Sequence, residues 1–159
     1  MEGVLLLLKL AIVALMAFLL LTYVFGLTRN HSLNMCPAFQ DGDLVMYYRL
    51  DRNFGTGDVV VVRYREHAYL ERVIASAGDT VDITQDGLVV NGSLVQEPYR
   101  QGQTTQFTEG VTFPLTVGSG ELFVLSDNRG TGPDSRIFGC IRAEDVSGKV
   151  MGLFRRRNF

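Results

Sequence analysis

Residues 57–65 read GDVVVVRYR, and this short run decides the fold class of the chain. Four consecutive valines and a tyrosine are typical of a β-strand, because β-branched and aromatic side chains fit the pleated surface of a sheet. The glycines at 55 and 57 supply a turn before the run. The same composition recurs in DLVMYYRL (43–50) and AYLERVIA (68–75), so all three runs are predicted to be strands.

Turn signals extend this pattern toward the C-terminus. Asp86-Gly87 and Asn91-Gly92 each separate β-rich runs, and such pairs are strong hairpin signals. Strand composition returns at residues 111–117, 121–125 and 148–154, whereas the Gln/Thr-rich residues 97–110 are predicted to form an exposed loop. No helical periodicity follows residue 30. The sequence therefore predicts a compact, mainly β body.

The N-terminal part has a different character. Residues 4–25 read VLLLLKLAIVALMAFLLLTYVF, which as a helix spans about 33 Å and matches a hydrocarbon core of about 30 Å. The run ends in bulky residues rather than the small residues of a cleavage site, which favours a retained anchor. We predict a cytoplasmic end and single transmembrane helix over residues 1–26, followed by an ectodomain over 27–159. Lys9 lies about one turn inside the N-terminal edge of the span, and Arg29 and His31 follow its other end, so charge alone leaves the orientation open.

The overall composition excludes several classes of function. The 159 residues include 15 basic and 17 acidic side chains, a balance that argues against nucleic acid as the main partner. The two cysteines, Cys36 and Cys140, are too few for a disulfide framework and lack the spacing of a zinc site. No metal and no cofactor are predicted.

Three segments together resemble the motif boxes of a known enzyme family: NMCPAFQDGDLV (34–45), YLERVIASAGDTVDITQDGLVVNG (69–92) and VLSDNRGTGPDSRIFGCI (124–141). In order and spacing they are similar to the type I signal peptidases of peptidase family S26. Those enzymes are membrane-anchored serine peptidases that use a Ser/Lys dyad and remove signal peptides on the outer face of the bacterial membrane. The resemblance implies a single-pass cell-membrane protein whose ectodomain is extracytoplasmic.

The residues that carry the family's chemistry are replaced. The position of the nucleophilic serine holds Asn34, and the position of the lysine base holds Glu71. A third family serine, which orients the lysine, corresponds to Gly132. A carboxamide is not a usable nucleophile, and a carboxyl group is not the uncharged amine that activates the serine. The resemblance therefore implies a catalytically degenerate member.

Two displaced nucleophiles are alternatives. Ser32, with Glu71 as its base, lies two residues before the family's serine position, and Cys36 has His31 as a nearby candidate base. With either one, the chain would be an active signal peptidase that cleaves signal peptides by an unusual route.

The resemblance also assigns roles to other positions. It implies a structural ion-pair network at Arg72, Asp127, Asp134 and Arg136. It implies a groove in which a peptide binds as an added strand, with candidate residues Ser32, Met35, Pro37, Phe39, Ile74 and Ala75. It places Cys36 and Cys140 in boxes that meet near the site, where a disulfide would suit an oxidising exterior.

The overall plan resembles degenerate homologues encoded in Gram-positive pilus gene clusters, which are needed for pilin polymerisation beside a sortase and are thought to act as membrane-bound chaperones. The resemblance implies a non-catalytic accessory in pilus assembly. The expected partners are the membrane, a segment of a secreted protein or pilin, and a sortase. A tethered structural protein that binds no peptide is a further alternative.

Overall fold

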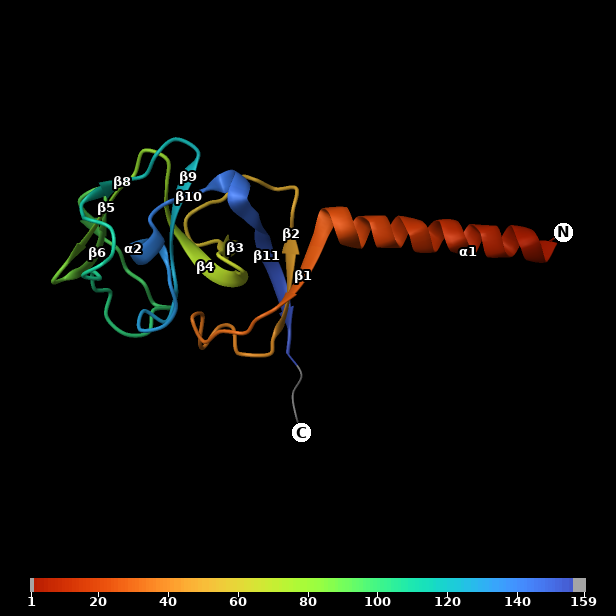
Figure 1. Ribbon diagram of the computed structural model, residues 1–159, viewed down its shortest axis with the longest axis horizontal. Coiled ribbons are helices and arrows are strands. Elements are labelled where there is room, and N and C mark those ends of the chain that lie inside the picture. The colour runs from red at the N-terminus through yellow and green to blue at the C-terminus, as the bar shows by residue number, and fades with distance from the viewer. Residues whose placement is uncertain (1, 156–159) are drawn as a thin grey trace.

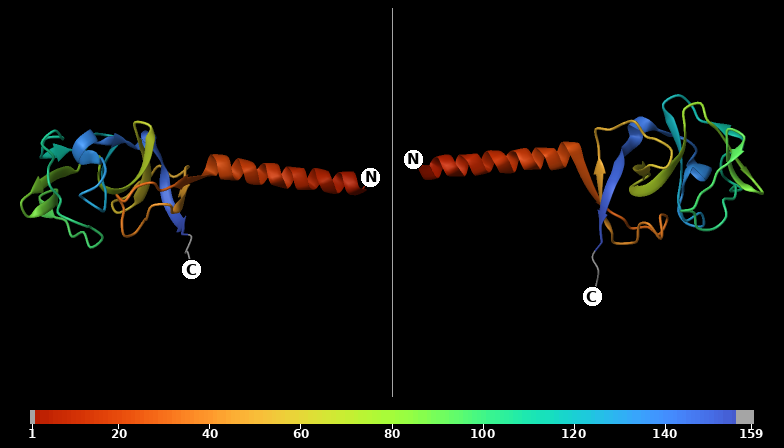
Figure 2. Two further views of the ribbon diagram at one scale, coloured as in Figure 1. Left: turned by 60° about the horizontal axis from the view of Figure 1, so that its bottom comes forward. Right: turned by 180° about the vertical axis from the view of Figure 1, so that it is seen from behind.

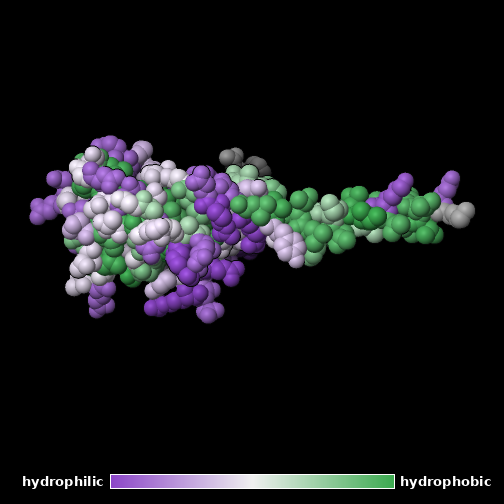
Figure 3. Space-filling view, turned by 90° about the horizontal axis from the view of Figure 1, so that it is seen from above, coloured by the Kyte–Doolittle hydropathy of each residue, from purple (hydrophilic) through white to green (hydrophobic). Residues whose placement is uncertain are grey.

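The computed structural model describes residues 2–155 and begins with one long helix. Helix α1 (Glu2–Leu19) continues into a π-helical turn, η1 (Leu20–Val24), and the first strand starts at Phe25. The helix projects from the body, and its surface is apolar almost throughout (Figures 1 and 3). By length and composition its 23 residues are able to cross a membrane, which fits the predicted anchor.

The body next to this helix is built on an antiparallel sheet of seven strands. Strands β3 (Val59–Tyr64) and β4 (His67–Ser76) form its centre as a tight hairpin in which Tyr64 pairs with His67. The order across the sheet is β1 (Phe25–Arg29), β2 (Leu44–Tyr48), β11 (Val146–Phe154), β3 (Val59–Tyr64), β4 (His67–Ser76), β9 (Glu121–Leu125) and β10 (Ile141–Arg142).

A second sheet of four strands forms the end of the body that lies far from the helix (Figures 1 and 2). Its order is β7 (Ser93–Leu94), β6 (Gly87–Val90), β5 (Thr80–Thr84) and β8 (Leu115–Thr116). Both predicted hairpin turns lie here: Asp86-Gly87 leads from β5 to β6, and Asn91-Gly92 joins β6 to β7. Asn91 and Gly92 have φ values of 51° and 78°, the left-handed backbone that Asn and Gly adopt most readily. The prediction of a mainly β fold is confirmed.

Apolar side chains pack into three clusters that hold the sheets and loops together. One lies between the small sheet and the buried ends of β4 and β9, and includes Ile74, Ala75 and Phe123. Another packs the turn after β1 onto the large sheet, through Met35 and Phe39. Because these turn residues are buried, the position of Asn34 beside the sheet is fixed.

Two features differ from the sequence prediction. A single helical turn, α2 (Ser135–Phe138), follows β9, and four residues are too few to produce a readable period. The loop at residues 97–110 is exposed only in part, because Arg129 reaches out to Glu97 and Thr104 and buries both side chains. A contact between residues this far apart in sequence leaves no local pattern.

Candidate functional site

The two positions that the sequence pairs are in direct contact. Asn34 lies in the turn after β1 and Glu71 lies on β4, and neither side chain is exposed to solvent. Asn34 Nδ2 donates hydrogen bonds to the Leu70 carbonyl at 2.6 Å and to Glu71 Oε1 at 2.9 Å. The amide thus ties the turn to the strand at the point where the family's dyad would lie.

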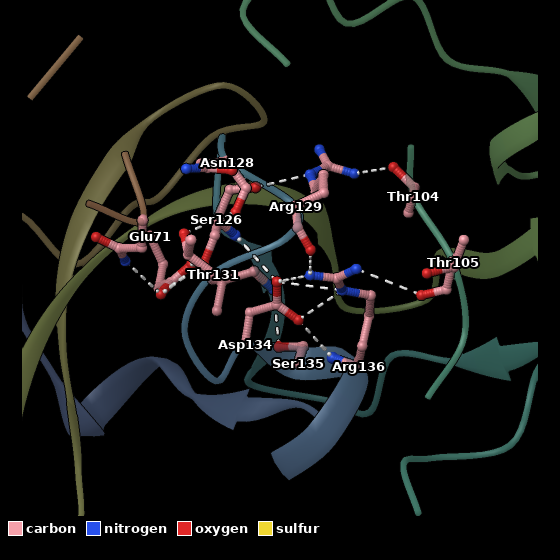
Figure 4. Close-up of polar contacts among 12 residues, drawn as sticks. Glu71, Thr104, Thr105, Ser126, Asn128, Arg129, Thr131, Asp134, Ser135 and Arg136 are labelled. Carbon is pink, nitrogen blue, oxygen red and sulfur yellow. Dashed lines mark hydrogen bonds and ion pairs between the residues drawn. The ribbon is translucent and has the colours of Figure 1, made fainter. Parts of the chain in front are cut away.

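Glu71 sits in an enclosed polar site at the end of β9. Ser126 Oγ lies 3.2 Å from Oε1 and 3.0 Å from Oε2 of Glu71 (Figure 4). Burial, and after it the nearby Asp134 carboxylate, raises the pKa of Glu71 well above its ordinary value, whereas hydrogen bonds from Ser126 and Asn34 oppose the shift. This environment favours an uncharged carboxylic acid, which is a poor proton acceptor.

Ser126 is a site residue that the sequence reasoning missed. Gly132 has φ +75°, and a Cβ placed on it would lie 3.3 Å from Asn34 Cβ and 3.8 Å from Ser126 Oγ. The Ser126 hydroxyl therefore lies close to the point that a side chain at position 132 would reach, and it contacts the Glu71 carboxyl. The only signal in the sequence was that Ser126 directly precedes the Asp127-Asn128-Arg129 motif.

The main chain around Asn34 is also fixed. Its carbonyl oxygen accepts a hydrogen bond from the Asn128 N–H at 2.7 Å, and its N–H donates to Ser32 Oγ at 3.1 Å. The side-chain oxygen, Oδ1, is buried and has no hydrogen-bond partner among residues 2–155. Asn34 is thus held in place by the hydrogen bonds that its N–H and its side-chain NH₂ donate. None of these contacts would activate the side chain for nucleophilic attack.

Neither alternative nucleophile is prepared for attack. Ser32 Oγ accepts the Asn34 N–H, while the Glu71 carboxyl bonds to Asn34 and Ser126 instead. Cys36 is half-buried. Within the part of the chain that the structure describes, neither Ser32 Oγ nor Cys36 Sγ has a hydrogen bond to a carboxylate or an imidazole.

The four predicted network residues form two separate ion pairs. Arg72 binds Asp127 through two contacts of 2.6 and 2.7 Å. Arg136 binds Asp134 at 2.7 Å, and both of these side chains are fully buried (Figure 4). Asp134 also accepts the Ser126 N–H at 3.3 Å, so this pair positions the serine that contacts Glu71. Losing one partner of a buried pair is costly, which suits a scaffold role.

The structure places most of the predicted groove residues elsewhere. Met35, Phe39, Ile74 and Ala75 are buried in the apolar clusters, at most 8% exposed. Pro37 is exposed on the surface. Of the six candidates, Ser32 alone lines a pocket among those described here. These four side chains therefore pack in the core of the chain, and the peptide groove itself stays a prediction.

The predicted disulfide is absent, since Cys36 and Cys140 are both free. Cys140 packs against the cluster between the sheets, and burial raises the pKa of its thiol to about 11. Cys36 lies in the turn that follows Leu33, near Arg155. The two thiols belong to different surroundings. In residues 2–155, no three His, Cys, Asp or Glu side chains gather to hold a metal.

A polar cleft opens beside this buried site. It has a volume of about 480 Å³ and lies between the end of β1, with the residues that follow it, and the tip of the β3–β4 hairpin. Its lining residues are Thr28, Arg29, His31 and Ser32 on one side, and Glu66, His67, Ala68 and Tyr69 on the other. We call it the polar cleft. One wall ends at Ser32, two residues before Asn34, and the other ends at Tyr69, two residues before Glu71.

Comparisons with known proteins identify the family to which the chain is similar. The family model described as "Signal peptidase, peptidase S26" matches residues 4–154. The chain is 31% identical over 142 residues to a signal peptidase I of Bacillus caldolyticus, covering 80% of this chain and 78% of that protein. It is 31% identical over 155 residues to a signal peptidase I of Bacillus licheniformis, covering 90% and 83%. A crystal structure of a signal peptidase I from Enterococcus faecalis matches with a TM-score of 0.54 at 30% identity, covering 62% of this chain and 97% of that one.

Proposed function

Because this chain belongs to the peptidase S26 family of signal peptidases, we propose that it is a non-catalytic member that binds a segment of a secreted protein instead of cleaving it. The observation that carries this proposal is the contact between Asn34 and Glu71. At the place where the family needs a hydroxyl and an uncharged amine, an amide donates to a carboxyl group in a sealed site.

The setting that we propose is the outer face of a cell membrane. The N-terminal helix would act as a single anchor and hold the body on the extracytoplasmic side. The resemblance to degenerate homologues of pilus gene clusters supports a role as an accessory or chaperone in pilin assembly, with a sortase as a further partner. A tethered binding module raises the local concentration of its partner at the membrane without any chemical step.

The competing function is an active signal peptidase, and the names of the relatives are the observation that favours it. In that case Ser32 or Cys36 would have to attack the scissile carbonyl. Ser32 Oγ accepts the Asn34 N–H and has no hydrogen bond to Glu71, so a conformational change would have to precede catalysis.

A cleavage assay separates the two functions. The purified, detergent-solubilised chain is incubated with a preprotein, beside a signal peptidase I of Bacillus licheniformis as the positive control. We expect no processing by this chain. Processing that is lost on Ser32→Ala or Cys36→Ala would overturn the proposal.

Partner binding is tested separately in cells. A photoreactive residue in place of His67, on the wall of the polar cleft, is irradiated and the crosslinked proteins are identified. We expect a secreted protein such as a pilin, and the same residue at exposed Ser119 should not capture it. If His67 captures no secreted protein, the chain is a tethered structural protein instead.

A further inference from the structure

We propose that the polar cleft binds an extended peptide segment rich in carboxylate side chains, rather than the small apolar residues that end a signal peptide. This inference rests on the proposed function and names the chemistry of the segment that is bound. It follows from three properties of the cleft: its free strand edge, its donors and its scarcity of aliphatic side chains.

The first property is an open hydrogen-bonding edge. Strand β4 pairs with β3 from Arg72 to His67, but β9 covers its other edge only from Arg72 to Ser76. Among the described residues, no strand pairs with residues 67–71 on that side. The Leu70 carbonyl there accepts a hydrogen bond from the Asn34 side chain. An extended peptide in the cleft would therefore find backbone groups on β4 to pair with, as an added strand does.

The second property is an excess of nitrogen donors. Arg29 lines the cleft together with His31 and His67, the two histidines of the chain. Arg29 is exposed and has no ion-pair partner among the described residues. One carboxylate, Glu66, faces them. Guanidinium and imidazole groups donate to carboxylates in short, charge-assisted hydrogen bonds, so the lining complements acceptors.

The third property is the scarcity of aliphatic side chains in this cleft. Ala68 is the only aliphatic side chain of its eight lining residues, and Tyr69 carries a hydroxyl. The residues expected to form apolar pockets, such as Met35 and Ala75, are buried in the core. A segment of small apolar side chains would leave the donors of the cleft without partners, which weakens binding.

Binding of labelled peptides to the full chain in detergent micelles tests the inference. The probes are a fluorescent 12-residue peptide of alternating Glu and Thr, the same peptide with Lys for Glu, and an Ala-rich peptide of equal length. We expect the Glu peptide to bind at least tenfold more tightly than the other two. Arg29→Glu should weaken its binding at least tenfold and strengthen that of the Lys peptide.

Arg63→Glu is the matched control, because Arg63 is also an exposed arginine, on strand β3, but lines a different pocket. It should leave the affinity for the Glu peptide within twofold. Equal or tighter binding of the Ala-rich peptide, or no effect of Arg29→Glu, overturns the inference. Neither result affects the proposed absence of catalysis, which the preprotein assay measures independently.

Discussion

Glu71 is the residue whose chemistry is most altered by folding. Its pKa is raised in the folded protein, chiefly by burial, so at pH values between the unfolded and the folded pKa the folded state holds a proton that the unfolded chain has released. The contribution of Glu71 to stability is therefore fully present below the unfolded pKa, near about 4.3. It falls as the pH rises and levels off above the folded pKa.

Replacing Glu71 with Gln tests this direction. The amide keeps an oxygen for Asn34 Nδ2 but no longer titrates. We expect Glu71→Gln to be more stable than the parent at pH 8 and to lose a slope of up to about 1.4 kcal/mol per pH unit above pH 5. Urea unfolding in detergent between pH 5 and 9 measures the slope.

Exposed Glu66, on the same hairpin, provides the control, and Glu66→Gln should keep the pH dependence of the parent. If Glu71→Gln unfolded with the parent's slope, the buried carboxyl would be ionised in the folded state. The account of the sealed acid site would then be wrong.

The position of the Ser126 hydroxyl predicts how the chain responds when a Ser/Lys dyad is built at positions 34 and 71. In the double variant Asn34→Ser, Glu71→Lys, the new lysine would meet a hydroxyl that lies 3.0–3.2 Å from the present carboxyl oxygens. We expect this variant to process a preprotein slowly, because the serine, amine and orienting group would all be present. Adding Ser126→Ala should lower the rate at least about tenfold, since misorientation alone is costly.

Exposed Ser119 is the control for that third substitution, and Ser119→Ala should leave the rate unchanged. Processing that is insensitive to Ser126→Ala would show that Ser126 does not orient the lysine.

Among the elements, strand β11 contains two glycines in different surroundings. A Cβ on Gly148 would lie 2.3 Å from the Tyr48 carbonyl oxygen and 2.7 Å from the Tyr47 ring, whereas a Cβ on Gly152 would meet nothing within 4 Å. We expect Gly148→Ala to lower the free energy of unfolding by about 1–3 kcal/mol. Gly152→Ala should be neutral or slightly stabilising, because alanine restricts the unfolded chain.

Thermal unfolding of both alanine variants in one detergent buffer makes the comparison direct. Equal melting temperatures for Gly148→Ala and Gly152→Ala would mean that β11 does not pass as closely over β2 as the structure shows.

The elements also show what the sequence can and cannot predict. The valine-rich strand β3 and the hairpin turns at Gly87 and Gly92 were predictable, because strand composition and turn chemistry are local. The contact between Asn34 and Glu71 was implied by family resemblance. The burial of Thr104 by Arg129 and the bond from Ser126 to Glu71 join distant segments, so no local pattern announces them.

At the scale of the whole molecule, the helix and the body are structurally separate parts. The helix makes no buried contacts with the body, whereas the body buries its own apolar clusters. The cleft beside Asn34 is formed entirely by the body, close to the strand that follows the helix. The proposed tethering and the proposed peptide binding are therefore separable, and a change confined to the helix should alter location without altering affinity for a peptide.

The apolar helix provides the test at this scale. Val13 lies in the middle of the 23-residue span, where an arginine costs about 2.5–3.5 kcal/mol of insertion free energy, whereas Val4 lies near the end, where an arginine side chain can reach the interface. We expect Val13→Arg to lower the fraction of protein that resists alkaline carbonate extraction from membranes, and Val4→Arg to leave it unchanged. Both variants carry the same added charge, so a difference between them reports depth in the bilayer. Equal extraction of the two variants would show that the helix does not hold the mature protein across the membrane. A mature protein whose sequenced N-terminus lies after residue 24 would show the same.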